Sequence, residues 1–549
     1  MFTCIGESLD LHCLAFVSSR LYNVGKSFLD IGNKTTDEQQ QQQQQQQSRK
    51  TLELPIIPGY LPSTLQVLNI TQRSPHQLEP GSLPASLSTL TINYIGVSIL
   101  QPGSLPASLT KLKLENFNQV ILHGVLPQGL ISLWTGNDFD KPLHAGVLPA
   151  SLQYLHLGES FNQQIVPGTF GQSLIKLYFG DSFNQILHLR TLPPYLQSLT
   201  LGEDYEQPFI PGALPSSLTR LIAGQSYNQE LSPGLLPSSI QYLSLGDCFD
   251  QIIQADTLPS SLTELIFPSF YNIPFDVAVL PSSLQTLELG DHFNQPFGVG
   301  VLPQSLYKLI LGMKFDQELL SDQLPSSLTY LSFGRNFNQP ITPGSLPTSL
   351  TTLKLGSRFN QQLAPGALPP SLTSLKLGRA FDQPLTSWMI PSSLAHLKLY
   401  LFKANVDSLP KSLISLRVYD VDKQTLTPGM LPSQLKELEL GLVGKLQVCS
   451  GALPDSLEKL IVPSNYQQPV PDSLRHMYIK VDQKIPGNML QSFSVRYPYV
   501  TNYHFIRVSN REYQCARIID PKTVLLQVDG KPAYIKNIND LTCTPCWST

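Results

Sequence analysis

The chain contains 549 residues with a formal net charge of −3, and only 14% of its residues are charged. This balance gives no reason to expect binding to nucleic acid or to a membrane, and no apolar run is long enough to predict a membrane-spanning helix. Seven scattered cysteines favour reduced thiols over a disulfide framework. Because the N-terminus also lacks the basic region of a signal peptide, we expect an intracellular and cytoplasmic protein.

The first predicted element, residues 1–36, is a short helical segment in which Leu14, Val17 and Leu21 lie on one apolar face. One interpretation is an amphipathic helix that covers the end of the following domain. A second interpretation starts from residues 9–22, LDLHCLAFVSSRLY, which resemble the second half of an F-box. That resemblance implies that Leu14, Val17 and Leu21 bind the adaptor of a ubiquitin ligase.

Residues 37–50 contain nine consecutive glutamines, from Gln39 to Gln47. A tract of a single polar residue type cannot bury a hydrophobic core. We therefore predict a disordered linker between the helical segment and the rest of the chain.

Residues 51–490 repeat a unit of about 22 residues, a period that indicates a solenoid. Residues 346–367, LPTSLTTLKLGSRFNQQLAPGA, are a representative copy. Leu353 and Leu355 are two residues apart, as on one face of a strand, and Pro365-Gly366 suits a type II turn. Two prolines in a typical unit exclude a long helix. The prediction is a mainly β solenoid of about twenty units.

An aromatic residue and an Asn or Asp follow each predicted strand, as in Phe359 and Asn360. Because a lone unit cannot bury enough surface to fold, we expect the aromatic side chains of neighbouring units to stack into one shared core. The Asn and Asp side chains can hydrogen-bond to nearby backbone. We interpret this second column as a structural ladder rather than as catalytic residues.

The unit resembles the FNIP repeat, whose pattern LPxSLxxLxLGxxFNQPLxPG is closely matched by residues 324–344. This family is a degenerate relative of the leucine-rich repeat. The resemblance implies a curved, leucine-rich-repeat-like array with parallel strands on its concave face, used for protein recognition.

Residues 491–549 change in character and are rich in β-branched and aromatic residues. We predict a small β cap over the open end of the solenoid, since a terminal strand otherwise presents unpaired edges. The pair Cys543 and Cys546 lacks the two further ligands of a zinc site, and we predict no metal there.

The alternation of the strands places the residues beside each inward leucine on the open face. Two clusters follow from reading that face along the array. The first contains four consecutive cations and three arginines just past their strands: Lys354, Lys376, Lys398 and Arg417, with Arg335, Arg358 and Arg379. The second is an aromatic patch: Trp134, Tyr154, His156 and Tyr178.

Each cluster has two interpretations. The cations are either a solvated face that nearby acids partly neutralise or a binding site for an acidic or phosphorylated segment. The aromatics are either ordinary sheet surface or a protein-binding hot spot.

No catalytic or phosphate-binding motif is present in the sequence, so we expect a non-enzymatic protein without catalytic residues, cofactor or metal. The preferred function is recognition of protein partners through the concave face, as the substrate-receptor subunit of an intracellular ubiquitin ligase. The alternative is an interaction scaffold in intracellular signalling that has no link to a ubiquitin ligase.

Overall fold

The structure is a computed structural model. It describes residues 58–59, 61–72, 78–94, 100–401, 408–421, 425–442, 446–481, 489–507, 513–520, 523–528 and 534–537. The predicted adaptor-binding residues Leu14, Val17 and Leu21, the glutamine tract, and the pair Cys543 and Cys546 lie outside the described residues.

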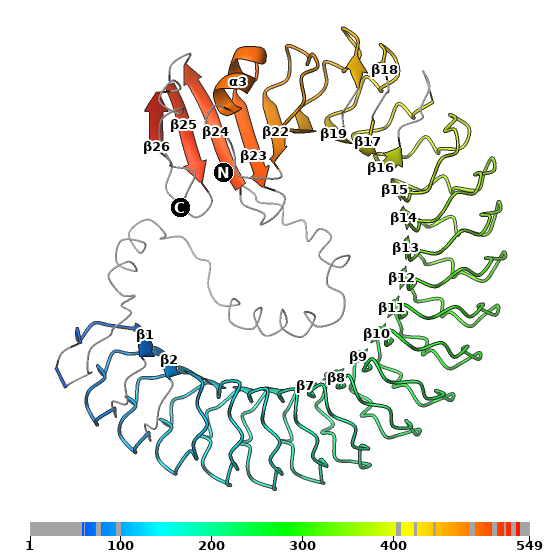
Figure 1. Ribbon diagram of the computed structural model, residues 1–549. Helices are drawn as coiled ribbons and strands as arrows, with labels where there is room; N and C mark the ends of the chain where they lie inside the picture. Colours follow the sequence, from blue (N-terminus) through cyan, green and yellow to red (C-terminus); the bar gives the residue numbers. More distant parts are fainter. Residues whose placement is uncertain are drawn as a thin grey trace.

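One long sheet organises the described chain, and its strands pair in the order in which they occur in the sequence. Every pairing from β1 to β23 in this sheet is parallel, with one unit of the chain separating neighbouring strands. The sheet curves into an arc that almost closes, with the strands along its inner side and the return segments along its outer side (Figure 1). The predicted parallel solenoid is confirmed.

The strands are longest towards the two ends of the array and only three residues long in the middle. The first strands are β1 (Val67–Gln72), β2 (Thr89–Tyr94) and β3 (Lys111–Glu115). The three-residue strands are β4 (Ser132–Trp134), β5 (Tyr154–His156), β6 (Lys176–Tyr178), β7 (Ser198–Thr200), β8 (Arg220–Ile222), β9 (Tyr242–Ser244), β10 (Glu264–Ile266), β11 (Thr286–Glu288), β12 (Lys308–Ile310), β13 (Tyr330–Ser332), β14 (Thr352–Lys354) and β15 (Ser374–Lys376).

Towards the C-terminal end the strands lengthen again, and a second, two-stranded sheet forms. The long strands are β16 (His396–Leu401), β17 (Ser415–Asp420), β19 (Glu437–Leu442), β21 (Lys459–Pro463) and β22 (His476–Val481). The small sheet pairs β18 (Thr425–Leu426) with β20 (Gln447–Val448).

The last described elements differ from the rest of the array. A helix, α3 (Met489–Arg496), precedes β23 (Asn502–Arg507), and it overlaps the start of residues 491–549, for which the sequence predicted a β cap. The chain then ends in antiparallel pairings among β24 (Tyr513–Asp520), β25 (Thr523–Val528) and β26 (Tyr534–Asn537). These pairings end the parallel run of the solenoid.

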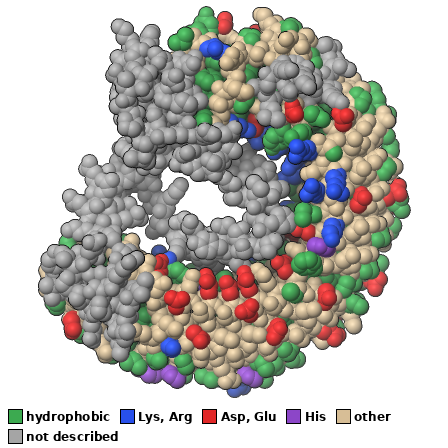
Figure 2. Space-filling model, in the orientation of Figure 1, with side chains coloured by type: hydrophobic (Ala, Val, Ile, Leu, Met, Phe, Trp, Pro, Cys, Tyr) green, Lys and Arg blue, Asp and Glu red, His purple; other side chains and the backbone are tan. Residues whose placement is uncertain are grey.

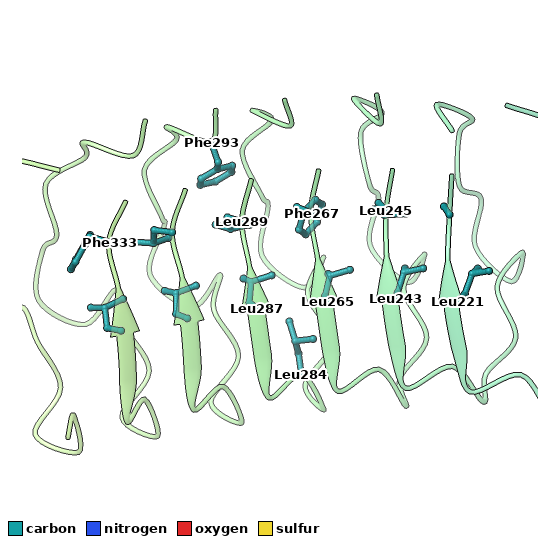
Figure 3. Packing of buried hydrophobic residues seen from close by; sticks show 14 of the residues in the cluster. Leu221, Leu243, Leu245, Leu265, Phe267, Leu284, Leu287, Leu289, Phe293 and Phe333 are labelled. Atoms are coloured by element: carbon teal, nitrogen blue, oxygen red, sulfur yellow. The ribbon is translucent and has the colours of Figure 1, made fainter. Parts of the chain in front are cut away.

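The middle residue of each short strand fills the core. Leu353 is fully buried and lies in register with Leu331 and Leu375 of the neighbouring strands. Thr352 and Lys354, on either side of it, are only half-buried. Figure 3 shows the same row of leucines on strands β8 to β11. The predicted alternation is therefore confirmed for these strands.

Three residues beside an inward leucine depart from this alternation and are buried: Ser198 and Thr200 on β7, and Ser415 on β17. Thr200, predicted on the open face, is 6% exposed. Its small side chain lies in register between the larger Tyr178 and Ile222, which shield it.

Behind the leucines, the aromatic residues of successive units form a spine. The rings of Phe293 and Phe315 stack with centroids 6.4 Å apart and planes inclined by 1°, and Phe337 and Phe359 stack at 6.0 Å. All four side chains are buried. Because each ring contacts the ring of the next unit, the units share one core, as expected from the energetics of a single repeat.

The Asn and Asp column forms the predicted ladder. The Asp316 Oδ1 atom accepts a hydrogen bond from the Asn338 backbone N–H at 2.8 Å. Asn338 in turn accepts one from Asn360, also at 2.8 Å. The same contact joins pairs along the column from Asn118 with Asp140 to Asn360 with Asp382. The backbone N–H of Glu206 donates to Asn184 in the same way. The carboxylates of this column act as acceptors for the backbone.

After the short strands, except β10, which has Pro268, a glycine lies two residues beyond the strand, where two backbones approach closely. A Cβ atom on Gly356 would lie 1.9 Å from the carbonyl oxygen of Gly334 in the preceding unit. No side chain fits at that distance, so this position fixes how tightly successive turns stack.

Candidate functional site: the inner face of the solenoid

Four cations lie side by side on the inner face, and we call them the cation column: Lys354, Lys376, Lys398 and Arg417. Strand pairing places each in register with the next, on β14 to β17. All four side chains are half-buried. Neighbouring strands in a sheet are about 4.8 Å apart, so like charges on adjacent strands repel by about 0.9 kcal/mol in water.

Acidic residues compensate the Arg417 end of the cation column. Arg417 Nε lies 3.5 Å from Glu439 Oε2, and Lys480 pairs with the same carboxylate. Lys398 lies over the ring of Tyr419, 5.1 Å from its centroid. Among the described residues, no ion pair involves Lys376 or Lys398. Positive charge therefore remains available in the middle of the column.

The three further arginines lie beside the column but not in it. Arg335, Arg358 and Arg379 follow the ends of β13, β14 and β15, where they are exposed. The backbone N–H of Arg358 donates to the Arg335 carbonyl at 2.9 Å, which places them on successive turns of the same edge. The Arg379 guanidinium lies over the Tyr400 ring, 5.0 Å from the ring centroid. These arginines extend the positive surface to the edge of the sheet.

The predicted aromatic patch is brought together as a stack across three strands. The rings of Trp134 and His156 meet edge to face, with their centroids 5.8 Å apart. The rings of His156 and Tyr178 are stacked, with their centroids 4.1 Å apart. Lys113 covers the other side, with its Nζ 3.7 Å from the Trp134 ring centroid. Tyr154 lies at the first position of β5, two residues before His156, and so belongs to the neighbouring column of the inner face.

The polar atoms of this stack are shielded by their neighbours. Within the described part of the chain, Trp134 Nε1 and His156 Nδ1 have no hydrogen-bond partner. Burial, followed by the charge of Lys113 among the smaller causes, lowers the pKa of His156 to about 4. His156 is therefore neutral at physiological pH and acts as part of an apolar aromatic surface.

An acidic row was not predicted from the sequence. Glu159, Asp181 and Glu203 occupy the first position after the strand-ending glycine in three successive units. Burial and, after it, like-charged neighbours raise the pKa of Asp181 and of Glu203. Gln225 donates to Glu203 at 2.9 Å. Reading the sequence at the position after each glycine would have revealed this row.

The two signs of charge are separated along the inner rim. Lys and Arg side chains gather along one stretch of it, and Asp and Glu side chains along another (Figure 2). The acidic row belongs to units around β5 to β7, whereas the cation column belongs to β14 to β17. The inner face thus offers different chemistry at different points of the arc.

A model of the FNIP Repeat family matches eight successive segments of this chain: 98–138, 139–182, 183–226, 227–270, 271–314, 315–358, 359–401 and 404–442. Together they account for more than half of its length. The chain belongs to the FNIP-repeat family. Comparison of this FNIP-repeat chain with curated proteins gave no match.

Among solved structures, the FNIP-repeat chain is similar to CroV588, described as a novel circular LRR protein. The two share 37% identity and a TM-score of 0.71, over 80% of this chain and 67% of the other. The predicted leucine-rich-repeat-like fold is therefore confirmed. The Toll–Spatzle complex of Drosophila has 14% identity and a TM-score of 0.38, over 87% of this chain and 67% of that one.

The described residues offer neither a metal site nor a membrane-spanning helix. No group of three or more His, Cys, Asp or Glu side chains is placed to hold a metal ion. No helix in the described ranges is long and apolar enough to cross a membrane.

Proposed function

We propose that this FNIP-repeat chain is an intracellular binding protein whose cation column recognises an acidic or phosphorylated protein segment. The observation that carries the proposal is the register of Lys354, Lys376, Lys398 and Arg417 on four adjacent strands. Such a row opposes folding slightly through repulsion. Binding of a row of carboxylates or phosphates removes the repulsion and adds charge-assisted hydrogen bonds.

The direct test is binding of a labelled decaglutamate peptide, and of its phosphoserine counterpart, to the full chain. Replacing Lys354, Lys376 and Lys398 together by Gln should weaken binding by tenfold or more at low salt. This corresponds to about 0.5–1 kcal/mol for each lost charge contact. The affinity of the unchanged protein should fall as salt is added.

A matched control removes the same charge elsewhere. Lys111, Lys141 and Lys411 lie outside the cation column, and their joint replacement by Gln should change affinity less than twofold. Equal weakening by the two triple variants would show that net charge, and not the column, governs binding.

The aromatic stack is the second candidate surface for a protein partner. Trp134, His156 and Tyr178 form a continuous apolar area on the inner face, and aromatic residues dominate binding energy at interfaces. A partner that uses both surfaces would span the inner arc from β4 to β17.

For the N-terminal segment we propose a role as ubiquitin-ligase substrate receptor, which rests on the F-box-like residues 9–22 of the sequence. Ligase subunits should co-purify with the full chain and be lost when residues 1–60 are deleted. Co-purification at an unchanged level after the deletion would overturn the F-box role of residues 9–22. Absence of ligase subunits from the proteins that co-purify with the full chain would favour the alternative, an interaction scaffold in intracellular signalling without a ligase.

A further inference from the structure

The column that carries the cations changes its chemistry before β14. From β8 to β13 the same position holds Ile222, Ser244, Ile266, Glu288, Ile310 and Ser332 in register. The three isoleucines are half-buried, so part of each apolar side chain faces the interior of the arc. They occur on every second strand, with a shorter or charged side chain between them.

The spacing of the isoleucines can be compared with the repeat of extended chains. Two strand steps amount to about 9.6 Å. A polyproline II helix places residues on one side every three residues, or about 9.3 Å. A β-strand presents alternate residues at about 6.8 Å, which does not match. Four strand steps, from Ile222 to Ile310, equal about six polyproline II residues.

Tyrosines flank this isoleucine row on the strands that carry serine. Tyr242 and Tyr330 occupy the first positions of β9 and β13. The Arg220 guanidinium lies 3.5 Å from the Tyr242 ring centroid, and Lys354 lies 5.2 Å from that of Tyr330. These contacts hold the rings in place beside the row. Proline-rich polyproline II segments dock on surfaces lined by aromatic side chains.

We propose that the partner segment is bipartite: a proline-containing polyproline II stretch with an apolar residue at every third position lies along the isoleucine row, and an acidic stretch continues over the cation column. The inference rests on the proposed function, because the cation column supplies its second half. Lys354 lies two strands beyond Ile310, so the first acidic residue follows the last apolar one by about three residues.

Three labelled peptides of equal length test this assignment with the full chain. The first has three Leu-Pro-Ser triplets followed by six Glu. The second has the same composition, but its three leucines are adjacent. The third replaces the leucines of the first by Ser. The first should bind at least tenfold more tightly than the other two.

The protein variants separate the two halves of the proposal. Replacing Ile222, Ile266 and Ile310 by Ser introduces the residue that this column already holds on β9 and β13, so the fold should be retained. This Ser variant should bind all three peptides with the same affinity. That affinity should equal the affinity of the unchanged protein for the third peptide, which lacks leucine. The lysine-to-Gln variant should lose affinity for every peptide.

Two results would overturn the bipartite assignment while leaving the proposed function in place. One such result is that the peptide with spaced leucines and the peptide with adjacent leucines bind with equal affinity. The other is that the Ser variant binds the peptide with spaced leucines as tightly as the unchanged protein does. In both cases the affinity would still depend on the lysines. Absence of binding by all three peptides, or binding that does not depend on the lysines, would overturn both.

Discussion

Asn338 and Asn360, one repeat unit apart, are joined by a hydrogen bond in which the Asn360 backbone N–H donates to Asn338 Oδ1 at 2.8 Å. Replacing Asn338 by Ala should cost about 1–3 kcal/mol, because the donor of the next unit loses its partner. Asn338→Asp should cost much less, since Asp316 fills the same role one unit earlier. Denaturant unfolding of both variants measures the difference, and similar losses would show that the acceptor oxygen is unimportant.

The inward and outward positions of one strand should differ strongly in their effect on stability. Leu353 is fully buried, and Leu353→Ala should cost about 2–5 kcal/mol through lost burial and a cavity. Thr352→Ala, on the open face of the same strand, should stay within about 0.5 kcal/mol. Urea unfolding tests the pair. Equal costs would contradict the orientation of β14.

The outer turn requires a positive φ angle, and Ala278 adopts one of 69° where most units have glycine. Ala278→Gly should stabilise the protein by up to about 1 kcal/mol, because relief of a left-handed conformation outweighs the entropy of glycine. Gly300, with φ of 81° and nothing within 4 Å of a built Cβ atom, supplies the reverse change. Gly300→Ala should therefore destabilise by a similar amount. Thermal unfolding of both variants checks the opposite signs.

Stability should fall as the pH drops from about 6.5 towards 4, because His156 titrates differently in the two states. Burial lowers its pKa to about 4 in the folded protein, so across this window the unfolded chain binds more protons. The difference corresponds to at most about 3 kcal/mol. His504 also has a pKa lowered to about 4 and acts in the same direction.

Unfolding free energies measured from pH 7 to pH 4 test this effect. A His156→Gln variant should show a shallower loss of stability than the unchanged protein. Asp181 and Glu203, whose pKa values are raised, favour the folded state at the acid end and limit the total loss. An identical pH profile for the variant would contradict a buried, neutral His156.

The architecture could be predicted from the sequence because every unit repeats the same physical constraints. Leu353, Phe359 and Asn360 recur at one spacing, so each ambiguity in one copy is resolved by its neighbours. The strand register follows directly, and with it the alignment of Lys354 with Lys376. Outside the repeats, α3 was missed because Phe493 and its neighbours carry an apolar run without a period that separates helix from strand.

The functional surface was only partly predictable. The cation column depends on alternation along one strand and was placed correctly. The aromatic contacts depend on rotamers, which periodicity does not specify, so the edge-to-face meeting of Trp134 and His156 required the structure. The burial of Thr200 depends on the size of its neighbours on two other strands, which reading a single unit does not include.

The most direct test of the central claim is to locate a bound acidic segment by photo-crosslinking. A photoreactive residue would replace Ser374, which lies on the inner face of β15, two positions before Lys376. The control site is Gln362, which is exposed on the return segment. With the labelled decaglutamate peptide, we expect crosslinks from position 374 that disappear when Lys354 and Lys398 are replaced by Gln, and none from position 362. Equal crosslinking from the two positions, or crosslinks at 374 that persist without the lysines, would contradict recognition by the cation column.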